Sequence, residues 1–211
     1  MYMSLKTTYI FKVREVSTMN TIDRIKEIIE ENHGILTTRM LTENGIHRQY
    51  IKKLVDEGYI FQQARGVYTT LATYVDEYYL TGRLYKDAIF SHSTALYLHG
   101  LSDRTPMELD MTFPSNVRPD NFTIIPHYIN RERLEVGLEL LEQRNGTILR
   151  VYNLERTICD IIRDRKKIDS QIFNDAIKGY MKRKDKNLNQ LYEYAKIFGI
   201  SKILKTYLEV L

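Results

Sequence analysis

Residues 20–70 read NTIDRIKEIIEENHGILTTRMLTENGIHRQYIKKLVDEGYIFQQARGVYTT, and this stretch decides the fold of the N-terminal part of the chain. Isoleucines recur at helical spacing after Asn20 and Thr21, and either of these two residues can cap a helix. His33-Gly34 then supplies a stop signal. The pattern predicts an amphipathic helix that buries its isoleucines on one face.

Two further helices are predicted in the middle of this stretch. A short one begins at Thr37 or Thr38 and ends before Asn44-Gly45. The next begins at residue 46 or 47 and runs to Glu57, where a glycine stops it. A tight turn therefore separates the second helix from the third.

A β-hairpin is predicted to follow the third helix. Residues 59–63 and 67–70 are rich in aromatic and β-branched side chains, and the break at residues 64–66 contains a glycine. The order helix, helix, tight turn, helix and hairpin is that of a winged helix-turn-helix. Residues 19–70 are therefore predicted to be a DNA-binding domain, preceded by an N-terminal arm or extension at residues 1–18.

The third predicted helix has two chemically different faces. At 100° per residue its apolar side chains fall on one side, namely Ile46, Tyr50, Ile51, Leu54 and Val55. The opposite side carries Arg48, Gln49, Lys52, Lys53 and Asp56. His47, at the start of the helix, is predicted to point toward the apolar side.

The polar face of this helix is predicted to bind DNA. Arg48 can fork onto guanine and Gln49 onto adenine in the major groove. Lys52 and Lys53 can neutralise phosphates, and Arg65 at the hairpin tip suits the minor groove or the backbone. Free N–H groups at the start of the second helix are expected to hold a phosphate, at Thr37, Thr38 and Arg39. A solvated helix face is the alternative, but the surrounding order of elements favours DNA binding.

Residues 71–211 are predicted to form a larger domain with a small antiparallel sheet and a helical C-terminus, which makes the chain α+β overall. Strands are predicted at 107–113, where apolar residues alternate from Met107, at 122–128, and at 138–144 and 147–152 around the hairpin signal Asn145-Gly146. Helices are predicted at 71–84, from Ser91 to Gly100, and at 154–163, 170–181, 188–198 and 201–210.

Charge is distributed unevenly along the 211 residues, which carry a formal net charge of +4. Residues 1–70 hold 10 Lys/Arg against 8 Asp/Glu, residues 71–160 hold 9 against 13, and residues 161–211 hold 12 against 6. An acidic middle segment between two basic ends favours an anionic partner such as nucleic acid.

Composition excludes several classes of protein. With 43% hydrophobic and 27% charged residues, the chain is neither wholly disordered nor fibrous. It has no apolar run of membrane-spanning length, and a single cysteine, Cys159, excludes an internal disulfide. A cytoplasmic location and no membrane partner are therefore expected.

Three blocks of the sequence resemble a known family. They are Arg65-Gly66-Val67-Tyr68 after the predicted helix-turn-helix, FSHSTALYLHGL at residues 90–101, and VYNLERTICD at residues 151–160. In this order and spacing, over about residues 20–165, they resemble the AbiEi antitoxins of abortive-infection systems, which are type IV toxin–antitoxin systems.

The resemblance implies a protein with two functions. The winged helix would repress its own operon by binding inverted repeats in the promoter. The C-terminal domain, residues 71–211, would counter a nucleotidyltransferase-like toxin in phage defence, without a stable complex. Periodicity and charge independently support only the DNA-binding function.

Ser91, His92, Ser93 and His99 raise the alternative of a metal site or a hydrolase site. His92 and His99 are seven residues apart and share a helix face, but no third ligand stands at a useful spacing. Capping and packing are the favoured roles, so no catalytic residue, metal or cofactor is predicted.

The last third of the chain carries charged residues whose role is left open. Arg156 and Asp160 form an i,i+4 pair, for which structural support is the default interpretation. A role in antitoxicity or in a second nucleic-acid surface is the alternative, for the basic residues Arg156, Arg163, Arg165, Lys166, Lys167, Lys182, Arg183 and Lys184. An ordinary solubilising face competes with this interpretation.

Two alternatives to the antitoxin hypothesis remain open on the sequence alone. One is a plain winged-helix regulator whose C-terminal domain senses a ligand or sets the oligomeric state. The other is a nucleic-acid-processing enzyme that uses the polar residues at 91–99 or 155–163.

Overall fold

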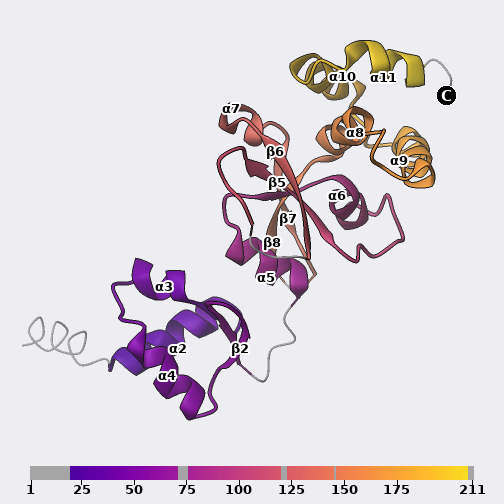
Figure 1. Ribbon diagram of the computed structural model, residues 1–211. Coiled ribbons are helices and arrows are strands. Elements are labelled where there is room, and N and C mark those ends of the chain that lie inside the picture. Colours follow the sequence, from indigo (N-terminus) through magenta and orange to yellow (C-terminus); the bar gives the residue numbers. More distant parts are fainter. Residues whose placement is uncertain (1–19, 71–75, 120–122, 145, 209–211) are drawn as a thin grey trace, which may run out of the picture. The chain divides into compact units, whose positions relative to one another are not determined.

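A computed structural model describes residues 20–70, 76–119, 123–144 and 146–208 (Figure 1). The chain divides into two compact units, Met1–Leu80 and Thr81–Leu211. The predicted arm at residues 1–18 and the first residues of the helix predicted at 71–84 lie outside the described residues. The functional boundary placed at residue 70 stays a prediction.

The N-terminal unit is a winged helix-turn-helix, which confirms the predicted fold. Its elements are α2 (Thr21–Glu31), β1 (Ile35–Thr37), α3 (Thr38–Glu43), α4 (Gln49–Asp56), β2 (Phe61–Ala64) and β3 (Val67–Thr69). Both β1 and β2 pair antiparallel with β3, in the sheet order β1-β3-β2. The three residues of β1 were not predicted, because a fully buried strand of this length shows no alternation.

The core of this unit forms from the amphipathic α2. The side chain of Asn20 caps the helix by accepting a hydrogen bond from the backbone N–H of Ile22 at 3.3 Å. The isoleucines of the inner face are buried against side chains of β1, α3 and α4, among them Leu36, Leu41 and Leu54. The spacing seen in the sequence thus becomes one continuous apolar core.

Gly66 fixes the hairpin to the start of α3. It has a φ of 77°, a conformation that glycine adopts without steric cost. Its carbonyl oxygen accepts a hydrogen bond from the N–H of Thr38 at 2.9 Å. A Cβ at Gly66 would lie 2.9 Å from Thr38 Oγ1, which is closer than real Cβ contacts come. The two segments therefore meet at a distance that requires glycine.

The C-terminal unit is built around a five-stranded sheet of order β6-β5-β4-β8-β7. With α5 (Glu77–Leu84) at the division between the units, the elements are β4 (Ile89–Phe90), α6 (His92–Leu98), β5 (Leu109–Pro114), β6 (Ile124–Ile129), α7 (Arg131–Leu134), β7 (Leu138–Glu142), β8 (Ile148–Tyr152), α8 (Leu154–Arg163), α9 (Ser170–Lys182), α10 (Leu188–Ile197) and α11 (Ser201–Leu208). The predicted α+β class with a helical C-terminus is confirmed.

Strand pairing in this sheet is antiparallel in part. The pair β7–β8 is the antiparallel hairpin that was predicted, and β4–β5 is also antiparallel although β4 was not predicted, whereas β5–β6 and β4–β8 are parallel. Hairpin signals in a sequence reveal only antiparallel neighbours, because parallel strands need a longer connection. The two parallel pairs were for this reason not predicted.

The prediction for β5 was wrong in its start and its pattern. The strand begins at Leu109, and Met107 before it is 96% exposed. All six residues of β5 are buried, so the polar Asp110 and Thr112 lie inside the unit together with the apolar residues of the other face. Both faces of this strand are covered, which alternation in the sequence does not reveal.

Helices cover the sheet and carry most of the apolar core of the unit. α6 packs against α8 and β5, and α9, α10 and α11 gather around α8 (Figure 1). Buried side chains such as Leu96, Ile161, Ala176 and Leu191 form this core. No helix among the residues with described positions is long and apolar enough to cross a membrane.

Gly137, just before β7, lies against α8. It has a φ of 80°, and a Cβ there would overlap the Cβ of Arg156 and lie 2.9 Å from its Cγ. Its carbonyl oxygen accepts a hydrogen bond from the N–H of Asn153, the residue that caps α8. The turn before β7 and the first turn of α8 are thus in direct contact.

We expect Gly137→Ala to destabilise the protein by about 2–5 kcal/mol, because the new methyl group combines a left-handed backbone with an overlap onto a buried side chain. Gly146→Ala is the matched control, since Gly146 has a φ of 78° and a Cβ there would meet no atom within 4 Å. The control should cost about 1–2 kcal/mol. Equal losses in urea unfolding would contradict the packing argument.

Gly66→Ala tests the contact of the hairpin with α3 in the same way. We expect it to lower the free energy of unfolding by about 1 kcal/mol more than Gly45→Ala. Gly45 has a φ of 68° but open space around it, so its variant carries the backbone cost alone. Hydrogen exchange of the N-terminal unit measures both variants, and a smaller loss for Gly66→Ala would refute the close approach.

Candidate functional site

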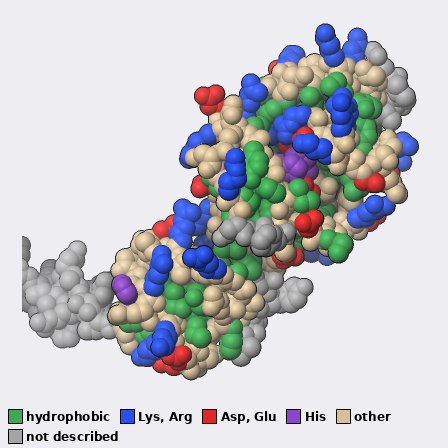
Figure 2. Space-filling view, viewed as in Figure 1, with side chains coloured by type: hydrophobic (Ala, Val, Ile, Leu, Met, Phe, Trp, Pro, Cys, Tyr) green, Lys and Arg blue, Asp and Glu red, His purple; other side chains and the backbone are tan. Residues whose placement is uncertain are grey.

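The predicted polar face of α4 is exposed, and its apolar face is buried. Ile51 and Leu54 point into the core, whereas Gln49, Lys52 and Lys53 are exposed. With eight residues, α4 is about 12 Å long, which is close to the width of the major groove of B-DNA. The exposure of this face agrees with the two faces predicted at 100° per residue, while its contacts with DNA stay a prediction. Figure 2 shows lysine and arginine side chains gathered on this unit.

The start of α4 differs from the prediction. The helix begins at Gln49, two or three residues later than expected, and Arg48 occupies the N-cap position. His47 therefore lies outside the helix, and the prediction that it points toward the apolar side was wrong. It is exposed, and its Nδ1 accepts a hydrogen bond from the N–H of Gln49 at 3.2 Å. Val55, assigned to the apolar face, is 38% exposed at its edge.

The phosphate site expected at the start of α3 is only partly available. The N–H of Thr37 bonds to Met40 Sδ at 3.3 Å, and the N–H of Thr38 bonds to the Gly66 carbonyl oxygen. Thr37 is also buried, with its hydroxyl oxygen capping the N–H of Met40 at 3.1 Å. The expectation that these two N–H groups are free was wrong. Arg39 remains exposed, in an ion pair with Glu43 at 2.9 Å.

The wing presents one basic residue at its tip. Arg65 and Gly66 form the two-residue turn between β2 and β3, so Ala64 belongs to the strand rather than to the break that was predicted. The side chain of Arg65 is exposed. The structure thus holds Arg65 on a turn whose second residue is hydrogen-bonded to α3, while its contact with DNA stays a prediction.

The basic residues of the last third of the chain do not form one cluster. Lys166 and Lys167 precede α9, and Lys182 and Lys184 lie at or beyond its end, so a helix of about 20 Å separates the two pairs. The arginines have protein partners. Arg163 pairs with Asp160 and Asp164, Arg165 donates to the carbonyl oxygen of Ile162, and Arg183 pairs with Asp185.

Arg156, for which a nucleic-acid or antitoxicity surface was the alternative to structural support, is completely buried. Its Nε donates to Asp160 Oδ2 at 3.0 Å, and its Nη1 donates to the carbonyl oxygen of Val136 at 2.7 Å. The guanidinium also lies over the rings of Tyr152 and Phe198, 4.0 Å from each centroid. Structural support, the default interpretation of the i,i+4 pair, is what these contacts provide.

The neighbours of Arg156 on α8 are structural as well. Glu155 is buried and accepts hydrogen bonds from Tyr180 Oη and from the N–H of Asn187, each at 2.9 Å. Burial raises the pKa of the Cys159 thiol to about 12, so this side chain is a protonated, packed thiol at neutral pH. These contacts join α8 to α9 and α10.

Four polar residues that the sequence separates widely meet in the C-terminal unit. The ring of His92 stacks on that of His127, with centroids 3.5 Å apart and an interplanar angle of 14°. His92 Nε2 lies 3.2 Å from Asp164 Oδ2, and His127 Nε2 lies 2.7 Å from Asp110 Oδ1. The hydrogen bond with His92 holds the pKa of Asp164 well below its usual range. We call these four residues the histidine–aspartate cluster.

This cluster was not predicted, because its residues lie on separate elements and no local spacing joins them. His99, the expected companion of His92, instead contacts the carbonyl oxygen of Tyr152 through Nε2 at 2.7 Å. Ser91 is the N-cap residue of α6, as predicted, but its Oγ lies 3.0 Å from His92 Nδ1 and caps no backbone N–H. The partners of His92 come from β6 and from the end of α8.

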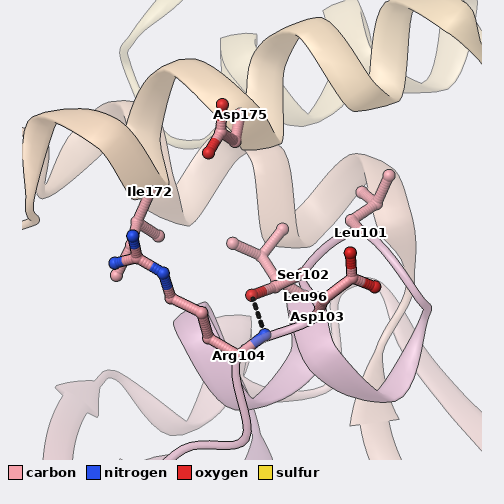
Figure 3. Close-up of a pocket in the computed structure, with 7 residues that line it drawn as sticks. All are labelled: Leu96, Leu101, Ser102, Asp103, Arg104, Ile172 and Asp175. Atoms are coloured by element: carbon pink, nitrogen blue, oxygen red, sulfur yellow. Dashed lines mark hydrogen bonds between the residues drawn. The ribbon is translucent and has the colours of Figure 1, made fainter.

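A cavity of about 250 Å³ lies between the end of α6 and α9 (Figure 3). Its wall combines the apolar Leu96, Leu101 and Ile172 with the polar Ser102, Asp103, Arg104 and Asp175. Arg104 Nη2 already donates to Gln171 at 2.9 Å. None of the predicted site residues lines it.

Comparison with known proteins bears on the N-terminal unit. Residues 23–70 match the family model described as "Transcriptional regulator, AbiEi antitoxin". No curated protein matches the chain significantly. The matched residues include α3, α4 and the wing, which are the elements that carry the exposed basic side chains. The resemblance seen in the sequence is confirmed for this segment, residues 23–70, which is similar to the transcriptional regulators and antitoxins of the AbiEi family.

Proposed function

We propose that this protein represses its own operon through the N-terminal unit and neutralises a nucleotidyltransferase-like toxin through the C-terminal unit. The observation that carries the proposal is the exposed polar face of α4 within a segment that matches AbiEi transcriptional regulators. That family model describes transcriptional regulators that are antitoxins. The operon, the inverted repeats and the toxin are the proposed additions.

In the proposed complex α4 enters the major groove of the operator. Gln49 contacts base edges from the first turn of α4, and Arg48 at the N-cap reaches guanine beside it. Lys52 binds a phosphate. Lys53 and Arg39 are held in exposed ion pairs with Glu57 and Glu43. Such surface pairs are weak, so a DNA phosphate can replace the glutamate.

Arg48 and Lys52 provide the first test of this arrangement. We expect Arg48→Ala and Lys52→Ala in the full chain to weaken operator binding. Loss of one phosphate contact by Lys52→Ala should also reduce the slope of log K against log salt by about 0.9. Fluorescence anisotropy at several salt concentrations measures both effects.

Arg24→Ala is the control for this titration, because Arg24 is an exposed arginine of the same unit on α2, paired with Glu27. Its loss should leave the affinity and the salt slope unchanged. Unaltered affinity in both α4 variants would remove α4 from the DNA interface.

A growth assay tests whether repression and toxin neutralisation belong to separate units. We expect the full-length double variant Arg48→Ala/Lys52→Ala, expressed from an unrelated promoter, to rescue cells from the toxin as well as the original protein does. The same variant should fail to repress a reporter fused to the operon's promoter. Loss of rescue together with repression would show that antitoxicity acts through DNA binding. Absence of rescue by the original protein would favour a plain regulator.

A further inference from the structure

The histidine–aspartate cluster brings metal-binding atoms together from three separate elements. His92 begins α6, His127 lies on β6, and Asp164 follows α8 directly. One ligand atom of each residue lies within 4.8 Å of those of the other two. Imidazole and carboxylate ligands in this ratio suit zinc and similar transition-metal ions, whereas Mg²⁺ and Ca²⁺ prefer oxygen ligands alone.

The fold of the sheet explains why the cluster forms. Asp110 and Thr112 share one face of β5, and Thr112 is paired in register with His127 of the neighbouring β6. The N–H of Ser91 bonds to the carbonyl oxygen of Asp110 at 3.0 Å, which sets the first residues of α6 beside the same strand. The ring of His92 therefore lies against that of His127, next to the buried strand β5.

Two of the three ligand atoms are already at a chelating separation. His92 Nε2 and Asp164 Oδ2 are 3.2 Å apart. For an ion about 2.1 Å from each atom, the N–metal–O angle would be about 100°, which is close to tetrahedral. The ring of His127 must tilt out of its stack with His92 to direct a nitrogen at the same ion, because the lone pairs of parallel rings do not converge. Arg163, 3.4 Å from Asp164 Oδ2, must then give up this contact.

The outer residues of the cluster orient the imidazoles as those of metal sites do. Asp110 Oδ1 holds His127 Nε2 at 2.7 Å, which directs Nδ1 of that ring to the ion. Ser91 Oγ lies 3.0 Å from His92 Nδ1, which leaves Nε2 of that ring to bind the ion. Metal-bound histidines usually use their second nitrogen to bond a carboxylate or another acceptor in this way.

The backbone and the exposure of the cluster also suit a binding site. His92 has a φ of 46°, a conformation that costs a residue with a Cβ about 1–2 kcal/mol and that is concentrated at functional sites. The side chain of His92 is buried, whereas those of His127 and Asp164 are 21% and 20% exposed. An ion can enter from this side and keep a water molecule as its fourth ligand. Figure 2 shows histidine side chains at the surface of the C-terminal unit.

We propose that His92, His127 and Asp164 bind one divalent transition-metal ion of the zinc type, with Asp110 and Ser91 orienting the two rings. The ion would link α6, β6 and the end of α8. This inference concerns the C-terminal unit alone and does not depend on operator binding.

Titration of the metal-free, full-length protein with Co²⁺ tests the proposal, because four-coordinate Co²⁺ has visible absorption bands. We expect one Co²⁺ per chain, displaced by Zn²⁺, and a higher melting temperature with either ion. His127→Gln and Asp164→Asn should each weaken binding at least tenfold, and Asp110→Asn about 10- to 100-fold. Circular dichroism of the metal-free variants checks their folding.

His47→Gln and Asp185→Asn are the controls, since both residues are exposed and lie outside the cluster. They should bind Co²⁺ as the original protein does. Absence of Co²⁺ bands in the original protein, or unchanged affinity in the double variant His127→Gln/Asp164→Asn, would overturn the proposal. Zn²⁺ must also shift the imidazole signals of two histidines in the NMR spectrum of the original protein, and unshifted signals would overturn it without any variant.

Discussion

The buried guanidinium of Arg156 is the interaction on which the C-terminal unit depends. It satisfies Asp160 on its own helix, reaches carbonyl oxygens of the segment before β7, and lies against the rings of Tyr152 and Phe198. β8, α8 and the end of α10 therefore meet at one charged group. Removing either member of a buried ion pair leaves the other charge uncompensated, at a cost of about 3–5 kcal/mol. Gly137 is required beside it because a larger residue would occupy the space of the arginine stem.

Much of this architecture was predictable from local signals. The helices of the last third begin where they were expected because Asn153, Asp169 and Asn187 each cap a helix with a side-chain oxygen. In the N-terminal unit, isoleucine spacing and glycine stops gave the three helices to within a few residues. The exposed face of α4 followed from the same periodicity, because an amphipathic helix has only one way to bury its apolar side.

What the sequence could not supply was contact between distant segments. His92 and Asp164 are 72 residues apart along the chain, and no spacing rule joins them. The i,i+4 pair of Arg156 with Asp160 indicated a structural role, but not full burial, because arginine is rarely fully buried and its carbonyl and ring partners come from other elements. The parallel pairing of β5 with β6 is a long-range contact of the same kind, and it carries His127 into the cluster.

The link between Gly66 and Thr38 bears on how a protein with the proposed function could change its operator over evolutionary time. The wing is positioned by a backbone hydrogen bond and a glycine, neither of which depends on the side chain at residue 65. The exposed side chains of α4 are likewise absent from the core that holds the helix in place. The residues that we propose to contact DNA are thus separate from the residues that hold α4 and the wing in position. Under the proposed function, substitution at a few exposed positions would select a new operator while the scaffold beneath them stays the same.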